Sequence, residues 1–350
     1  MTELRDMLAD SVTRLFRDGA ARRAAAAGFD AALWSQVHEL GLPSLLVSEE
    51  QGGVGGGWED ALAVLQPAGF HAIGLPIAES MLAARLLGGA GLEGGSGLAV
   101  AGPAAGKLHK SGKDFRFTGT FRSLPWGRDA QSVVTSLMLD GKPHVLLLPR
   151  ERAELRLAVN LAGEPRDELR FESSAVQAAP SDAAEAVQLH DYCALLRLAQ
   201  TVGALEAALT LSIDYARERK QFGRAIGQFQ AVQQQLALFG AEAAAVACAA
   251  RAAFQAAAGG EASFQIGAAK LRANLAIGLA TATAHQVHAA IGFTWEHGLR
   301  HLTQRLMSWR SEFGNDRYWS ERLGAAVAAR GAERFWSDLT ARDDAAALAS

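Results

Sequence analysis

The stretch YARERKQFGRAIGQFQAVQQQLA (215–237) places charged and amide side chains between two apolar segments of helical period. Arg219 and Gln221 precede Gly223, where a first helix would end, and Gln230 stands where a second helix would begin. A guanidinium and a carboxamide displayed at such a junction can bind the anionic and hydrogen-bonding groups of a ligand through charge and matched hydrogen bonds. The alternative is a polar joint between helices, in which Arg219 pairs with a carboxylate of a neighbouring helix.

Other sets of reactive side chains are weaker. His297 and His301 stand one helical turn apart, a zinc-binding spacing, but Gly298 lies between them and the glutamate of an HExxH motif is missing. The glycine-dense segment 48–60, SEEQGGVGGGWED, lacks a preceding strand pattern and the Gly-Lys-Ser/Thr ending of a phosphate-binding loop. We therefore expect a loop between helices there, and no metal site.

Composition indicates a soluble globular protein. The chain has 350 residues, more than one hydrophobic core usually serves, with 49% hydrophobic and 20% charged residues and a net charge of −3. That charge gives no reason to expect a nucleic-acid partner, and no signal peptide or membrane-spanning segment is expected. Cys193 and Cys248 lie in apolar helical patterns without CxxC spacing, which favours a reducing, cytoplasmic compartment.

Three regions must position these side chains. Apolar residues at helical spacing and punctuating glycines predict an N-terminal helical domain over 1–96. Over 97–182 the period becomes two, with short runs joined through Asp140-Gly141, so we predict a small antiparallel β domain. The helical period returns over 183–350, where alanine-rich segments favour long helices packed as a bundle and the last ten residues are expected to fray.

This order of regions, together with the stretch 215–237, resembles the acyl-CoA dehydrogenase family. Three further segments resemble family elements in the same order: ELGLPSLLVSEEQGGVG (39–55), PWGRDAQSVV (125–134) and HQVHAAIGFTWEHGLR (285–300). The likeness covers most of the chain and implies a mostly α fold with a small β domain and a C-terminal four-helix bundle. The short chain and its FTWEH segment resemble subunits of heteromeric acyl-CoA dehydrogenases.

The resemblance implies FAD as the cofactor, bound partly by a neighbouring subunit. Arg219 would contact the pyrophosphate, Gln221 and Phe222 would line the same groove, and Gln230 would approach the adenine. Gln286 corresponds to a family glutamine at the adenosine end, and Trp126 would wall the flavin. The family carries paired glycines where this chain has Ala289-Ala290, and each added methyl group narrows the approach of backbone to cofactor.

Family chemistry also requires a carboxylate base, whose pKa is raised by a dry pocket. One family position falls in WRSEFGND, where Glu312 serves as the base if one residue is deleted and Phe313 takes its place in an ungapped alignment. The other position falls on Cys193, and the nearby Asp191 would point to another helix face because two residues turn a helix by about 200°. Glu312 is the predicted base; a solvated helix-end glutamate near Arg310 is the alternative.

Two functions follow from the resemblance. The first is FAD-dependent α,β-dehydrogenation of an acyl-CoA thioester to the 2-enoyl-CoA, with Glu312 as base, Glu296 as a weaker candidate, and electrons passed to an electron-transfer flavoprotein. The second is a non-catalytic structural subunit that lends Arg219 and Gln230 to the FAD of a homologous chain. A third reading keeps the flavin but changes the substrate to a molecule that is not a thioester. In each case a homo-oligomer or a heteromer is expected.

Overall fold

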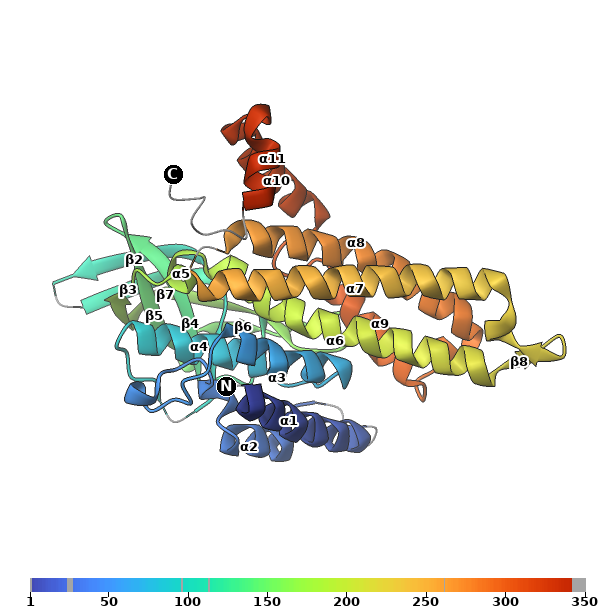
Figure 1. Cartoon of the computed structure of the whole chain (residues 1–350). Coiled ribbons are helices and arrows are strands. Elements are labelled where there is room, and N and C mark those ends of the chain that lie inside the picture. Colours follow the sequence, from blue (N-terminus) through green and yellow to red (C-terminus); the bar gives the residue numbers. More distant parts are fainter. Residues whose placement is uncertain (1, 24–27, 96, 113, 261, 342–350) are drawn as a thin grey trace.

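The fold is mostly helical, with one small sheet between the N-terminal helices and a long helical bundle (Figure 1). The computed structural model describes residues 2–23, 28–95, 97–112, 114–260 and 262–341. The predicted mostly α fold is therefore confirmed. Nine of the last ten residues, for which the sequence predicts fraying, lie outside the described residues.

Four helices form the N-terminal region. Asp30 caps the second of them by accepting a hydrogen bond from the Leu33 N–H at 2.9 Å, as expected for an aspartate just before an apolar-periodic segment. A short 3-10 turn, Glu49–Gln51, and the glycines after it connect the second and third helices, so the predicted loop is confirmed. The helices are α1 Thr2–Arg23, α2 Ala31–Glu39, α3 Trp58–Phe70 and α4 Ile77–Gly89.

The sheet is antiparallel except for one pair. Its order is β1-β4-β5-β7-β3-β2, with β6 on β7, and only β1 and β4 run parallel. Asp140 and Gly141, with φ of 51° and 77°, form the tight turn predicted between β4 and β5. Between β5 and β7 the strand β6 pairs with β7, and Val159 forms an isolated bridge with Pro165. The strands are β1 Ala99–Ala101, β2 Ala105–Ser111, β3 Asp114–Pro125, β4 Ser132–Leu139, β5 Lys142–Pro149, β6 Glu154–Arg156 and β7 Arg166–Pro180.

Long helices form the predicted bundle. Helix α6 is central and packs against α7, α8 and α9, while a two-stranded hairpin between α6 and α7 projects from the end of the bundle that is remote from the sheet (Figure 1). Helices α10 and α11 extend away from the bundle. The elements are α5 Ala184–Val187, α6 Leu189–Glu218, β8 Lys220–Gln221, β9 Arg224–Ala225, α7 Gln230–Ala258, α8 Ser263–His288, α9 Gly298–Trp309, α10 Asp316–Arg330 and α11 Phe335–Ala341.

The N-terminal helices and the bundle share one hydrophobic core, and the sheet has a second. Helices α3 and α6 cross at Gly69 and Gly203, where backbones touch: a Cβ on Gly203 would lie 1.9 Å from the Gln66 carbonyl oxygen. Because this core runs across regions, the domain boundaries after residues 96 and 182 stay predictions.

Two helices, α6 and α7, are long and apolar enough by composition to cross a membrane. In α6, 78% of the most apolar window is buried inside the fold, so this helix owes its composition to its place in the core. In α7 the buried share of the window is 22%, and much of its alanine-rich face lies on the outside of the bundle.

Candidate functional site

The hairpin after α6 displays the side chains that the sequence singled out. Arg219 ends the helix in an extended conformation, and its N–H donates to the Tyr215 carbonyl at 2.8 Å. Phe222 and Gly223 form a two-residue turn between β8 and β9, with φ of 53° and 79°. Both residues adopt the left-handed conformation that such a turn requires, so the KQFGRA sequence folds back on itself.

Five predicted cofactor residues lie exposed at this end of the bundle. The Phe222 side chain is 91% exposed, and Tyr215 stacks on His288 with ring centroids 4.6 Å apart, which joins the last turns of α6 and α8. Within the described part of the chain no side-chain hydrogen bond or ion pair engages Arg219, so the alternative of an interhelical polar joint is not realised. These free donors fit the phosphates and adenine of a cofactor approaching from outside. The five residues are Arg219, Gln221, Phe222, Gln230 and Gln286.

Trp126 lies elsewhere. Its side chain is buried in the core of the sheet, and its ring packs edge-on against Phe29 with ring centroids 6.1 Å apart. The backbone N–H of Trp126 donates to the Pro165 carbonyl at 3.3 Å. The sheet and the hairpin stand at opposite ends of the bundle (Figure 1). Trp126 therefore does not join the exposed group within one chain, and 5% of the residue is exposed.

Glu312 lies in the turn between α9 and α10, held by two arginines. Its carboxylate accepts from Arg166 at 2.7 and 3.1 Å, lies 3.1 Å from Nε of Arg197, and accepts from the Asn160 amide at 3.3 Å. Burial would raise the pKa of Glu312, but the two guanidinium groups outweigh burial and hold the pKa below its ordinary value. A proton-abstracting carboxylate needs the opposite shift. These surroundings oppose the predicted role of Glu312 as base, which stays a prediction.

Glu312 belongs to a buried chain of six alternating charges that links α4, α6, α9, the start of β7 and the turn before α10. Successive pairs are 2.5–3.1 Å apart, and three arginines balance three glutamates. Burial opposes ionisation of Glu164, yet its arginine neighbours outweigh burial and lower its pKa to about 2. In order the chain runs Arg305, Glu164, Arg166, Glu312, Arg197, Glu79.

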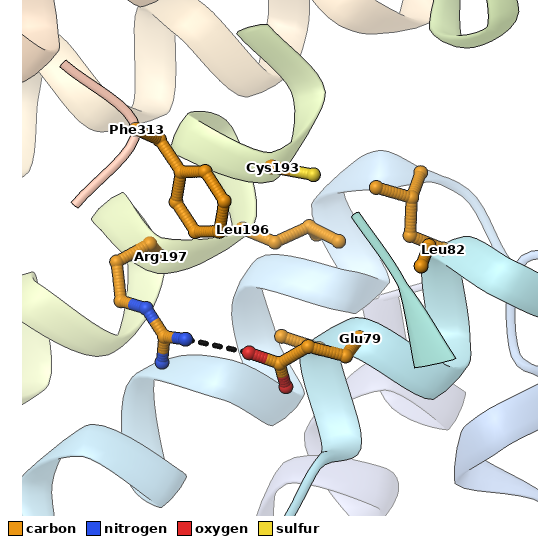
Figure 2. A pocket seen from close by; sticks show the side chains of 8 residues that line it. Glu79, Leu82, Cys193, Leu196, Arg197 and Phe313 are labelled. Atoms are coloured by element: carbon orange, nitrogen blue, oxygen red, sulfur yellow. Dashed lines mark hydrogen bonds and ion pairs between the residues drawn. The ribbon is translucent and has the colours of Figure 1, made fainter. Parts of the chain in front are cut away.

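A small cavity lies at one end of this chain (Figure 2). Cys193, at one family position for the base, and Phe313, at the other position in an ungapped alignment, both line it, so the two positions lie close together. Burial raises the pKa of the Cys193 thiol, and Phe313 carries no ionisable group. Asp191 faces away and pairs with Arg322 at 2.5 Å. The cavity is lined by Ala78, Glu79, Leu82, Ala101, Cys193, Leu196, Arg197 and Phe313, with about 220 Å³ of empty space including solvent at its mouth.

Sequence reasoning missed Glu79 and Arg197. Glu79 is in the first turn of the apolar helix α4, and Arg197 interrupts the run CALLRLAQ of α6; both are 5% exposed or less. A charged residue at a core-facing position is rarely buried without a partner. A charged residue within an apolar helical run was therefore the sequence signal that could have predicted this buried ion pair.

The turn that carries Phe313 is fixed from the other side by Lys270. Its ammonium group donates to Asn274 at 2.6 Å and to the carbonyls of Trp309 and Arg310 at 3.0 and 3.3 Å. Burial lowers the pKa of Lys270 to about 7. Since α8 thereby grips the end of α9, Phe313 is held with its ring toward the cavity.

The segment HQVHAAIG ends α8 with strained backbone. Ala289 has φ of 53° and ψ of −141°, a conformation that favours glycine, at one of the two positions where the family has glycine. The rings of His285, His288 and His297 cluster near it. Within the described ranges no group of three or more His, Cys, Asp or Glu side chains could hold a metal ion.

Comparison with known proteins identifies the family. Two family models match: acyl-CoA dehydrogenase, N-terminal domain, over residues 2–100, and acyl-CoA dehydrogenase, C-terminal domain, over residues 191–328. Acyl-CoA dehydrogenase IpdE2 of Mycolicibacterium smegmatis is 26% identical over 339 residues, which covers 93% of this chain and all of that protein.

Solved structures share the fold. The steroid acyl-CoA dehydrogenase Tcur3481-Tcur3483 (G363A variant) superposes with a TM-score of 0.87 at 21% identity, covering 95% of this chain and 99% of that one. The ChsE4-ChsE5 complex from Mycobacterium tuberculosis gives a TM-score of 0.84 at 22% identity, covering 94% and 98%. The predicted fold class and resemblance are thus confirmed: the chain belongs to the acyl-CoA dehydrogenase family, FAD-dependent oxidoreductases of lipid metabolism.

Proposed function

We propose that this chain is the supporting subunit of a heteromeric acyl-CoA dehydrogenase, and that a homologous partner chain supplies the catalytic base. The observation that carries the proposal is the cavity at which both family base positions meet, because they hold Cys193 and Phe313. Neither side chain can accept a proton from a carbon acid here, since burial raises the pKa of the thiol and phenylalanine does not ionise.

The exposed hairpin supports the second half of the proposal. Arg219 would hold the pyrophosphate of the partner's FAD, Gln221 and Phe222 would line the same groove, and Gln230 and Gln286 would bind at the adenosine end. When bound, FAD supplies hydride acceptance from the acyl β-carbon. The residues of this chain contribute charge and hydrogen bonds, and these give affinity only when a neighbouring subunit brings the cofactor to them.

The substrate class and partners follow from the same placement. The assembly oxidises an acyl-CoA thioester to the 2-enoyl-CoA in the cytoplasm and passes electrons to an electron-transfer flavoprotein. Two similar structures, a steroid acyl-CoA dehydrogenase and the ChsE4-ChsE5 complex, support a heteromer and a bulky acyl group. The apolar outer face of α7 suits contact with another protein chain.

The test is an absorption spectrum of the chain purified alone and of the chain co-expressed with a homologous acyl-CoA dehydrogenase encoded beside it. Alone, the chain should be colourless; together, the two should show a flavin spectrum that bleaches on anaerobic addition of a panel of acyl-CoA thioesters. A chain that binds flavin alone and bleaches with substrate is self-sufficient, and the proposal then fails.

A Glu312→Gln variant tests the residue assignment within the active assembly. We expect turnover to change by less than about threefold, because the carboxylate is neutralised by Arg166 and Arg197 and accepts no substrate proton. A loss of about a thousandfold with the flavin still bound would restore Glu312 as the base. The matched control is Glu321→Gln, an exposed glutamate of α10 that pairs only with Arg317 at the surface.

A further inference from the structure

We infer that Arg197 keeps this chain's own acyl cavity closed and is the residue that prevents it from accepting a thioester. The inference rests on the proposed supporting role, because it explains how a chain with the family fold leaves its own cleft unused. By the family resemblance, the base faces the acyl α-carbon, so the cavity between Cys193 and Phe313 is where an acyl chain would enter.

Arg197 is fixed by contacts on every side. Its Nη2 donates to Glu79 at 2.5 Å, its Nε lies 3.1 Å from a Glu312 oxygen, and its Nη1 donates to the Gln200 amide oxygen. The guanidinium also lies over the Trp309 ring, 5.2 Å from the centroid. Only 4% of the residue is exposed, so these protein contacts, not water, hold the guanidinium in place.

The Arg197 guanidinium therefore pairs with two carboxylates near the cavity, those of Glu79 and Glu312. Glu79 lines the cavity from α4, while Glu312 lies in the turn that carries Phe313. For Glu312, the guanidinium groups of Arg166 and Arg197 stabilise the charged form and lower the pKa, which makes this carboxylate a weak base. Arg197 thus fills space at the cavity wall and also pairs with the carboxylate beside Phe313.

The rate at which a thiol reagent labels Cys193 can be used to measure whether the cavity is closed. It lies four residues before Arg197 on α6, so both side chains project on the same helix face toward the cavity (Figure 2). Its side chain is buried, whereas the second cysteine, Cys248, is exposed on α7. Because Cys193 and Arg197 both line the cavity, removal of the arginine side chain should open space beside the thiol.

The experiment measures labelling of the full chain by methyl methanethiosulfonate, followed at each cysteine by mass spectrometry. The thiolate attacks the sulfenyl sulfur, forms a methyl disulfide and releases methanesulfinate. In Arg197→Ala the rate at Cys193 should rise about tenfold or more over wild type, with Cys248 unchanged as the internal reference. Equal Cys193 rates in wild type and variant would overturn the inference.

Two further variants separate closure from general loosening. Arg305→Met breaks the same charge chain at its far end without touching the cavity, so it should leave the Cys193 rate at the wild-type level; a rise equal to that of Arg197→Ala would refute a specific role for Arg197. If Arg197→Ala does not fold, Glu79→Gln combined with Arg197→Met removes both charges and serves in its place.

Butyryl-CoA supplies the ligand arm. It should slow Cys193 labelling in the Arg197 variant and have no effect on wild type. Protection of Cys193 by butyryl-CoA in wild type, with Arg197 in place, would contradict the inference. Because labelling needs neither flavin nor a partner, a failure here is distinguishable from a failure of the proposed function, which is read from flavin content.

Discussion

At the residue scale, Glu312 differs from a proton-abstracting carboxylate in the cations around it. Two arginines contact its oxygens, and both arginines also contact other glutamates, so no charge in the group is free to change during a reaction. The next residue, Phe313, takes the family's base position in an ungapped alignment. Its φ is 53°, and its ring lines the cavity. Two adjacent residues of this turn thus differ in role: Glu312 joins the buried ion pairs, and Phe313 forms part of the cavity wall.

Ala289 provides a test of backbone strain at this scale. Its φ of 53° with ψ of −141° belongs to a region that glycine adopts without steric cost. Ala289→Gly should therefore raise the free energy of unfolding by about 1 kcal/mol, measured by urea denaturation.

The neighbouring Ala290→Gly is the matched control. Ala290 lies within a 3-10 turn and has no positive φ, so glycine there should cost about 0.5–1 kcal/mol through the entropy of the unfolded chain. If both substitutions lower the free energy of unfolding, the backbone conformation of Ala289 carries no measurable strain.

At the element scale, the crossing of α3 and α6 sets the shape of the shared core. A Cβ on Gly203 would meet the Gln66 carbonyl oxygen at 1.9 Å, and a Cβ on Gly69 would meet that of Gln200 at the same distance. Since backbone rather than a flexible side chain is in the way, the helices must separate. Gly203→Ala should lower the free energy of unfolding by about 3 kcal/mol in a denaturant titration.

Gly240→Ala is the control, for which we expect the opposite change in the free energy of unfolding. Its Cβ would find its nearest neighbour, Leu209, at 3.8 Å, an ordinary contact, and alanine is the better helix former. The free energy of unfolding should rise by about 1 kcal/mol. A destabilised Gly240→Ala protein would show that the helix, not the crossing, governs the Gly203 result.

Helix α10 is docked on α6 by an ion pair with a pH signature. Asp191 pairs with Arg322 at 2.5 Å, and although burial opposes it, hydrogen bonds from His190, Arg322 and Ser263 lower its pKa from 3.8 to about 2. A carboxylate with a lowered folded-state pKa adds stability above its unfolded-state pKa and loses it as pH falls through the folded value. The contribution, about 2 kcal/mol, is complete above about pH 4 and disappears toward pH 2.

Asp191→Asn removes this contribution. The difference in unfolding free energy between wild type and variant should be constant from about pH 7 to 4 and shrink below pH 4, as followed by urea titrations at each pH. Asp214→Asn, whose partner Arg217 is exposed, should leave stability unchanged at every pH. A pH-independent difference for Asp191→Asn would rule out the lowered pKa.

At the scale of the whole molecule, the hairpin and the cavity stand far apart. The exposed donors of the hairpin sit at the end of the bundle opposite the sheet, and the cavity lies between α4 and α6 beside the sheet (Figure 1). A single chain cannot bring both to one cofactor. The proposed function therefore needs an assembly to complete the site, and the residues that the structure describes offer Arg219 no side-chain partner and leave much of the outer face of α7 exposed.

Arg219→Ala tests this division within the assembly. Loss of a charge-assisted hydrogen bond to a pyrophosphate should raise the FAD dissociation constant about 10- to 100-fold, measured by flavin fluorescence during dilution, with oligomeric mass unchanged. Arg217→Ala, two residues earlier and paired with Asp214, should bind FAD as wild type does. Equal FAD affinity in all three proteins would exclude the hairpin from the cofactor site.

The sequence by itself determined the mostly helical fold with its small sheet, the Asp140-Gly141 turn, the junction between two helices at 219–230 and the family, because local period, turn chemistry and a long motif depend only on neighbouring residues. Only the tertiary structure decided that Cys193 and Phe313 meet at one cavity, that Glu312 turns to Arg166 and Arg197, and that Trp126 is buried. These outcomes depend on contacts between residues far apart in the sequence, whose pairing no local period encodes.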